Sequence, residues 1–127
     1  MDTKKSILVV EDEALIACDL QHILEAKGYR VIGPAASAGA ALPLIDSETP
    51  DLALLDADLG KTTSFELADA LSARNAKIIF LSGHSLKWFS GAHRNRRVLE
   101  KPFLPEDLVA AVEEEFHAVP QTLSAAG

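Results

Sequence analysis

Six polar or charged residues stand where short apolar runs of the sequence end, and their chemistry suits a cation and a phosphoryl group. They are Glu11, Asp12, Asp56, Asp58, Ser82 and Lys101. Two carboxylates about 4 Å apart repel each other by about 4 kcal/mol at an effective dielectric constant of about 20, so clustered carboxylates need a cation. Hard carboxylate oxygens favour Mg²⁺, which also bridges to phosphate. Glu11, Asp12 and Asp56 together with Lys101 leave two negative charges, which one divalent cation balances.

The apolar runs are typical of buried parallel strands, and these strands must bring the six residues together. We expect strands over 7–10, 31–35, 52–55, 78–81 and 98–99. Because they alternate with helical patterns, the chain predicts an α/β fold with a doubly wound parallel sheet. Binding sites of such sheets lie at the carboxyl ends of the strands. All six residues end or follow a strand, so we expect them at one edge of the sheet.

Helices are predicted between the strands from the spacing of apolar residues. One covers residues 14–27, and the last covers 105–117, where acidic residues follow a proline in the first turn. Thr63 and Glu66 form a capping-box pattern, which predicts that a further helix opens at Thr63.

Two segments predict less regular structure. Pro43 lies inside the apolar pattern of 40–46 and lacks the N–H that a helix interior needs. We therefore expect that helix to be short or to begin at the proline. Residues 84–97 mix glycine, aromatic and basic residues, and they predict at most a short or distorted helix.

Composition and charge restrict the classes of function. The 127 residues carry 12 Lys and Arg against 19 Asp and Glu, a formal net charge of −7, and this length is typical of one domain. The acidic balance argues against direct nucleic-acid binding, which needs clustered basic residues. No apolar run reaches the roughly 20 residues of a membrane span, and the short polar start does not resemble a signal peptide. We expect a cytoplasmic chain with no membrane partner and no separate output domain.

Four runs of the sequence, in this order, carry a resemblance to a known family: ILVVEDE, PDLALLDADLG, IIFLSG and VLEKPF. They resemble the CheY-like receiver domains of two-component response regulators, of the stand-alone type, and the match extends over about residues 6–117. The resemblance implies a flavodoxin-like (βα)5 sandwich with a five-stranded parallel sheet of order 2-1-3-4-5. It also implies a receiver domain over 1–119 and a flexible tail over 120–127.

The resemblance further implies a role for each of the six residues. Asp56 is the phosphoacceptor, which takes a phosphoryl group from a histidine kinase or a phosphotransfer protein. Ser82 donates a hydrogen bond to a phosphoryl oxygen, and Lys101 neutralises another, with a cis peptide before Pro102. The Mg²⁺ ligands are the side chains of Glu11, Asp12 and Asp56 and the backbone carbonyl of Asp58.

The expected activity is therefore signalling, and the protein is not an enzyme in the ordinary sense, although it assists its own phosphorylation and dephosphorylation. The implied partners are a sensor kinase or phosphotransfer protein and a downstream protein target, with dimerisation linked to phosphorylation.

The sequence departs from the family pattern at several positions. Val98 stands where the family usually has an aromatic residue that turns inward on activation, so that switch is in doubt here. Gly60 replaces a common proline, and residues 84–97 replace a regular helix of the usual partner surface, which suggests altered partner choice. Leu104 stands where an aspartate or serine would cap the last helix.

Two other functions stay open at the level of the sequence. One is an interaction module that keeps the fold without using phosphorylation, and Val98 favours it. The other is a phosphatase similar to haloacid dehalogenases, because DADLGKT followed by Ser82 and Lys101 resembles that nucleophile motif. That class places its nucleophile on the first strand, whereas Asp56 follows the third run. The side chain of Asp58 is either solvated or controls water access to the phosphoryl group.

Overall fold

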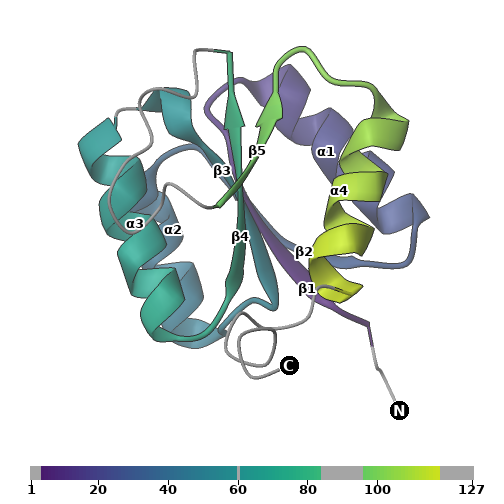
Figure 1. Cartoon of the computed structure of the whole chain (residues 1–127). Coiled ribbons are helices and arrows are strands. Elements are labelled where there is room, and N and C mark those ends of the chain that lie inside the picture. Colours follow the sequence, from purple (N-terminus) through teal and green to yellow (C-terminus); the bar gives the residue numbers. More distant parts are fainter. Residues whose placement is uncertain (1–3, 60, 84–95, 118–127) are drawn as a thin grey trace, which may run out of the picture.

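Five apolar runs form one parallel sheet in the computed structural model of the chain, which describes residues 4–59, 61–83 and 96–117 (Figure 1). The strand order is β2-β1-β3-β4-β5, as predicted. The strands are β1 (Ser6–Val10), β2 (Arg30–Ala35), β3 (Leu52–Asp56), β4 (Lys77–Ser82) and β5 (Arg97–Glu100). Each overlaps a predicted run and extends it by one residue or a few. The doubly wound fold is therefore confirmed.

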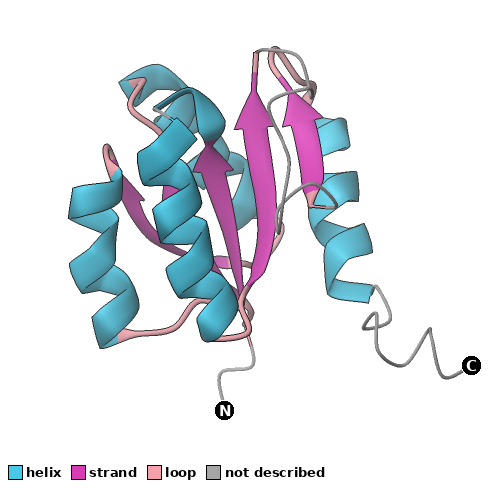
Figure 2. Ribbon diagram, turned by 60° about the vertical axis from the view of Figure 1, so that its left-hand side comes forward, coloured by secondary structure: helices cyan, strands magenta, loops and turns pink. Residues whose placement is uncertain are grey.

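Two pairs of helices cover the two faces of this sheet. In Figure 1, α1 and α4 lie on one side and α2 and α3 on the other, and Figure 2 shows the same layers after rotation. The described α-helices are α1 (Ala14–Ala26), α2 (Ala38–Ser47), α3 (Lys61–Ala73) and α4 (Pro105–His117), and the short 3-10 helix η1 (Ala57–Leu59) follows β3. The last helix spans the predicted residues.

The core has two halves because side chains alternate across each strand. Leu8 and Phe80 face α2 and α3, where they pack with Leu71. Ile7 and Leu81 face α1 and α4 and join a second cluster. Both faces of the central strands are apolar and fully buried, as parallel strands covered on two sides require.

Two helix predictions were wrong at their boundaries. Helix α2 runs through Pro43, which lies inside it, and starts at Ala38 after Ser37, whose side chain accepts from the Ala40 N–H. The proline removes the bond to the Gly39 carbonyl, and both residues are exposed, so water can hydrate that carbonyl. Helix α3 begins at Lys61 rather than at Thr63.

Some predictions fall on residues outside the described ranges. The irregular helix of 84–97 lies almost wholly there, as does the tail over 120–127, so the fifth helix of the (βα)5 pattern is not described. Among the described residues, no helix is long and apolar enough to cross a membrane.

Candidate functional site

The carboxyl ends of four strands meet at one edge of the sheet and place most of the predicted site residues there. Asp56 is the last residue of β3, and Ser82 is the last residue of β4. Glu11 follows β1 directly, and Lys101 follows β5. The side chains of Glu11, Asp56 and Ser82 are buried although they are polar. Neighbouring parallel strands end together, and this alone brings residues up to 90 positions apart in the chain into one site.

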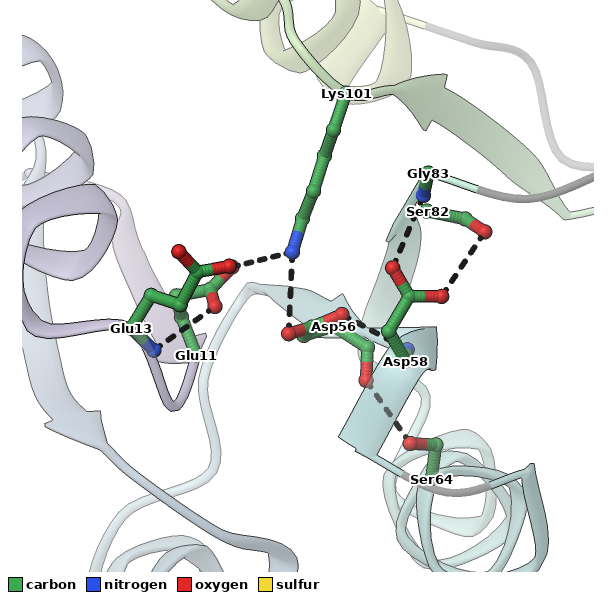
Figure 3. Close-up of polar contacts among 8 residues, drawn as sticks. All are labelled: Glu11, Glu13, Asp56, Asp58, Ser64, Ser82, Gly83 and Lys101. Atoms are coloured by element: carbon green, nitrogen blue, oxygen red, sulfur yellow. Dashed lines mark hydrogen bonds and ion pairs between the residues drawn. The ribbon is translucent and has the colours of Figure 1, made fainter.

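An ammonium group stands between two buried carboxylates at the centre of this edge (Figure 3). The Lys101 Nζ lies 3.0 Å from Glu11 Oε1 and 3.1 Å from Asp56 Oδ2. The lysine side chain is only 14% exposed, so water screens these ion pairs weakly. A single positive charge faces two negative ones, and the pair of carboxylates therefore remains under-neutralised.

The burial of these groups changes their proton affinities. Burial raises the pKa of Glu11 from its ordinary 4.5 to about 7, and the neighbouring Asp56 carboxylate raises it as well, against the opposing effects of Lys101 and the Glu13 N–H. Burial lowers the pKa of Lys101, but its hydrogen bonds and ion pairs with Glu11 and Asp56 outweigh burial and leave that pKa raised. The lysine therefore stays charged, while Glu11 holds its proton more tightly than an exposed glutamate does unless a further cation approaches.

The donor set at this edge fits a divalent cation. Glu11, Asp12 and Asp56 each offer a carboxylate oxygen, and the three oxygens lie within 4.8 Å of one another. Among the described residues, the buried Glu11 Oε1 has no donor besides the Lys101 ammonium, which lies 3.0 Å away. Its other oxygen accepts from the Glu13 N–H at 3.1 Å. Hard oxygen ligands of this kind suit Mg²⁺.

Two hydrogen bonds fix the position of Asp56. The Asp58 N–H donates to Asp56 Oδ1 at 2.8 Å, and the Ser64 hydroxyl donates to the Asp56 backbone carbonyl at 3.0 Å. Ser64 lies in α3 and is 2% exposed. The sequence interpretation missed this serine, and a polar residue on the apolar face of the helix was the available signal.

The Asp58 side chain reaches from η1 to the end of β4. Its Oδ2 accepts from the Gly83 N–H at 3.0 Å, and its Oδ1 lies 3.4 Å from the Ser82 hydroxyl oxygen (Figure 3). The residue is exposed to solvent. The carboxylate is thus hydrogen-bonded across the site as well as exposed, and its control of water access to the phosphoryl group stays a prediction.

The segment after β5 carries the lysine into the site. The Lys101 N–H donates to the Ser82 carbonyl at 2.9 Å, which continues the pairing of β4 with β5 by one residue. The Lys101–Pro102 peptide bond is cis, as the resemblance implied. Val98, at the position of the aromatic switch, is half-buried and packs against the core cluster under α2 and α3.

A cavity of about 430 Å³ opens beside the ion pairs, between α1 and the segment that precedes α4. Its walls are mainly apolar, and Lys101 belongs both to the cavity and to the ion-pair cluster. The other principal lining residues are Ile16, His22, Ile23, Pro102 and Phe103. Two leucines next to this lining are unusually exposed, with Leu15 at 83% and Leu104 at 59%.

Comparison with known proteins adds to this geometry. Residues 7–113 match the family model of the response regulator receiver domain. The transcriptional regulatory protein PdtaR of Mycobacterium tuberculosis is 32% identical over 113 residues, which are 86% of this chain and 55% of that protein. The phyllosphere-induced regulator PhyR of Methylorubrum extorquens is 31% identical over 117 residues, 89% of this chain and 44% of that protein. The chain thus spans about half the length of these curated relatives.

Solved structures agree with the sequence relatives. A CheY-like response regulator receiver domain protein from Methanospirillum hungatei shares 33% identity with a TM-score of 0.78, covering 88% of this chain and 93% of that one. SdrG from Pseudomonas melonis, solved in its BeF3-activated conformation, shares 34% identity with a TM-score of 0.74, covering 89% of this chain and 97% of that one.

Proposed function

The chain belongs to the response regulator receiver domain family, and from that membership we propose that it accepts a phosphoryl group on Asp56 with the help of Mg²⁺. The observation that carries this proposal is the arrangement around the Asp56 carboxylate. It is 1% exposed, lies 3.1 Å from the Lys101 ammonium, and shares a cluster of carboxylate oxygens with Glu11 and Asp12. This is a nucleophile beside a cation site, as phosphoryl transfer to a carboxylate requires.

The transfer step balances with groups already at the site. An oxygen of Asp56 donates an electron pair to phosphorus, while the bond from phosphorus to the donor's histidine nitrogen breaks and its electron pair stays on the imidazole. Glu11, Asp12 and Asp56, with the backbone carbonyl of Asp58, would hold Mg²⁺, which neutralises negative charge on the transferring group when bound. Lys101 supplies a second positive charge, and its proximity to Asp56 supports that role.

Ser82 is the proposed hydrogen-bond donor to the transferred group. It ends β4 beside Asp56 in the sheet, since Asp56 pairs with Leu81 and Ser82 is the next residue. Its side chain is buried, so little water competes for its hydroxyl. We further propose that water later attacks the aspartyl phosphate, which returns inorganic phosphate and the free Asp56 carboxylate.

The phosphodonor is proposed to be a sensor histidine kinase or a histidine phosphotransfer protein that docks over the cavity beside α1. Leu15 and Leu104 are adjacent in sequence to lining residues and are exposed, so they are available as apolar contacts for a docking partner. Lys101 lines the cavity and contacts Asp56, so a protein seated on it would stand next to the acceptor. We place this exchange in the cytoplasm, where such donors obtain their phosphoryl group from ATP.

Output is proposed to occur through a downstream protein target, with dimerisation linked to phosphorylation as a further means of regulation. The two curated relatives named above are regulators about twice as long as the matched region.

The deciding experiment is phosphoryl uptake from a small acyl phosphate. With Mg²⁺ and acetyl phosphate, the wild type should gain the mass of one phosphoryl group, and Asp56→Asn should gain none. Asp51→Asn is the matched control, because Asp51 lies at the other end of β3 and has no contact with the site among the described residues. It should be labelled like the wild type. An unlabelled wild type, or labelled Asp56→Asn, would refute the proposal.

The same experiment separates the two alternative functions. Sustained release of phosphate from unrelated phosphomonoesters over many turnovers would favour the phosphatase. A chain that takes up no phosphoryl group and still binds its partner would favour the phosphorylation-independent module. The family is one of signalling domains, and the central carboxylate ends the third strand of the chain rather than the first, so uptake of a single phosphoryl group is the result we expect.

A further inference from the structure

The Asp58 carboxylate binds two hydrogen-bond donors at the end of β4. Its Oδ2 accepts from the Gly83 N–H at 3.0 Å, and its Oδ1 lies 3.4 Å from the Ser82 hydroxyl oxygen. The Asp58 N–H donates to Asp56 Oδ1 at 2.8 Å, so the same residue contacts the proposed acceptor and the donors opposite it. Figure 3 shows the carboxylate between Asp56 and the strand end.

These two donors are placed to serve an oxyanion attached to Asp56. Asp56 and Ser82 end neighbouring strands, and a phosphoryl group on the former would carry oxygens that need hydrogen-bond donors. A hydroxyl has one proton to donate, so Ser82 cannot serve the Asp58 carboxylate and a phosphoryl oxygen together. Both acceptors are negatively charged, so they would also repel each other when they compete for the same donors.

We propose that Asp58 is an internal competitor of the phosphoryl group. In the unphosphorylated protein its carboxylate occupies the donors of Ser82 and Gly83, and phosphorylation of Asp56 displaces it. The Ser82 hydroxyl then changes its hydrogen-bond acceptor without losing its proton, and the contact forms again after hydrolysis. This inference rests on the proposed function and adds a regulatory contact to it, which we call the Asp58 latch, made of Asp58, Ser82 and Gly83.

The latch raises the free energy needed to add a phosphoryl group to Asp56, because the contacts of Asp58 with Ser82 and Gly83 must break first. Removing it should therefore strengthen the binding of a phosphoryl mimic. Asp58→Ala removes both acceptors, whereas Asp58→Asn removes the charge and keeps one oxygen acceptor. Asp58 is exposed, so neither substitution is expected to prevent folding.

The first test measures the affinity of beryllofluoride, a noncovalent phosphoryl mimic, for the whole chain at saturating Mg²⁺. We expect affinity to rise about tenfold in Asp58→Ala and by a smaller factor in Asp58→Asn, within the usual range of coupling between two sites. Glu13→Gln is the matched control, because it removes one exposed negative charge at the same edge and has no described contact with Ser82 or Gly83. An Asp58→Ala affinity equal to that of Glu13→Gln would overturn the competition.

The second test detects the hydrogen bond from the Gly83 N–H to Asp58 by NMR, without any phosphoryl mimic. The Gly83 amide proton should shift upfield and exchange faster with solvent in Asp58→Ala, and it should not change in Glu13→Gln. An unchanged Gly83 amide in Asp58→Ala, with normal phosphoryl uptake by the wild type, would overturn the latch and leave the proposed function intact. A wild type that neither takes up a phosphoryl group nor binds beryllofluoride would overturn the proposed function and the competition together.

Discussion

The two ends of the sheet each hold a cluster of serine and acidic side chains, but the acidic groups of the two clusters differ in burial and in their partners. At the amino end, Asp51 Oδ2 accepts from the Ser6 N–H at 2.8 Å and contacts the Ser6 hydroxyl, which in turn accepts from the Asp51 N–H. At the carboxyl end, Glu11 and Asp56 share one lysine. The Asp51 carboxylate is exposed to water and accepts from the neutral donors of Ser6, whereas the buried carboxylates of Glu11 and Asp56 share a single positive charge. The first cluster therefore links the residues at the amino ends of β1 and β3, and the second is suited to bind a cation.

The largest expected effect comes from removing the shared cation. Lys101→Met should lower the free energy of unfolding by about 2–4 kcal/mol in EDTA at pH 8, because it leaves two buried carboxylates without their partner. Lys77→Met, at the first residue of β4 and thus at the amino end, should change it by less than about 0.5 kcal/mol. Urea unfolding measures both values. Equal losses at the two ends would contradict the proposed difference.

Unfolding measurements at a series of pH values test the raised pKa of the buried Glu11 carboxylate. Burial raises the pKa of Glu11 to about 7, so between about pH 4.5 and 7 the unfolded chain has lost a proton that the folded protein keeps. Rising pH therefore favours unfolding of the wild type, and Glu11→Gln lacks this effect. From pH 5 to pH 8 in EDTA, the stability of the variant relative to the wild type should increase by about 2–3 kcal/mol. A difference that stays constant with pH would show that Glu11 does not titrate in this way.

Magnesium should stabilise the protein only through the carboxyl end of the sheet. At ten times its dissociation constant, Mg²⁺ should raise the free energy of unfolding by about 1.4 kcal/mol. Asp12→Asn should lose most of this gain, because the exposed Asp12 carboxylate belongs to the acidic cluster, while Asp51→Asn should keep it. Urea unfolding with and without Mg²⁺ measures the gain, and calorimetry supplies the dissociation constant. Loss of the gain in Asp51→Asn would remove the distinction between the ends.

The smallest expected effect comes from comparing alanine substitutions of Ser6 and Ser82. Ser6→Ala should cost about 1 kcal/mol of stability, the usual value of a hydrogen bond, and should leave phosphoryl uptake unchanged. Ser82→Ala should slow uptake, because the transferred group loses a donor. Unfolding curves and the time course of labelling with acetyl phosphate compare the two variants. Slow uptake in Ser6→Ala would mean that the amino end also contributes to the reaction.

The strands and their order could be predicted from the sequence because the signals are local and agree with one another. Each strand is a short apolar run, and a polar residue ends or follows four of them at the carboxyl edge. The parallel arrangement then brings Glu11, Asp56 and Lys101 together without any further information. These residues were found because the sheet alone determines where they meet.

The remaining features depend on contacts that the sequence does not display. The course of α2 through Pro43 depends on which of its sides faces solvent. The bond from Ser64 to Asp56 and the reach of Asp58 to Gly83 depend on rotamers and on loop paths. Such details follow from packing between distant segments, which local patterns do not encode.

The backbone bond from the Lys101 N–H to the Ser82 carbonyl has a mechanical consequence. It links the residue that carries the hydroxyl to the residue that carries the ammonium, so the two groups are coupled through the main chain as well as through any ligand between them. A displacement of the end of β4 would pull on the segment that leads into α4. On the proposed phosphorylation of Asp56, a displacement at the end of β4 would be transmitted through the main chain toward α4, whose last turns form ion pairs with Arg97.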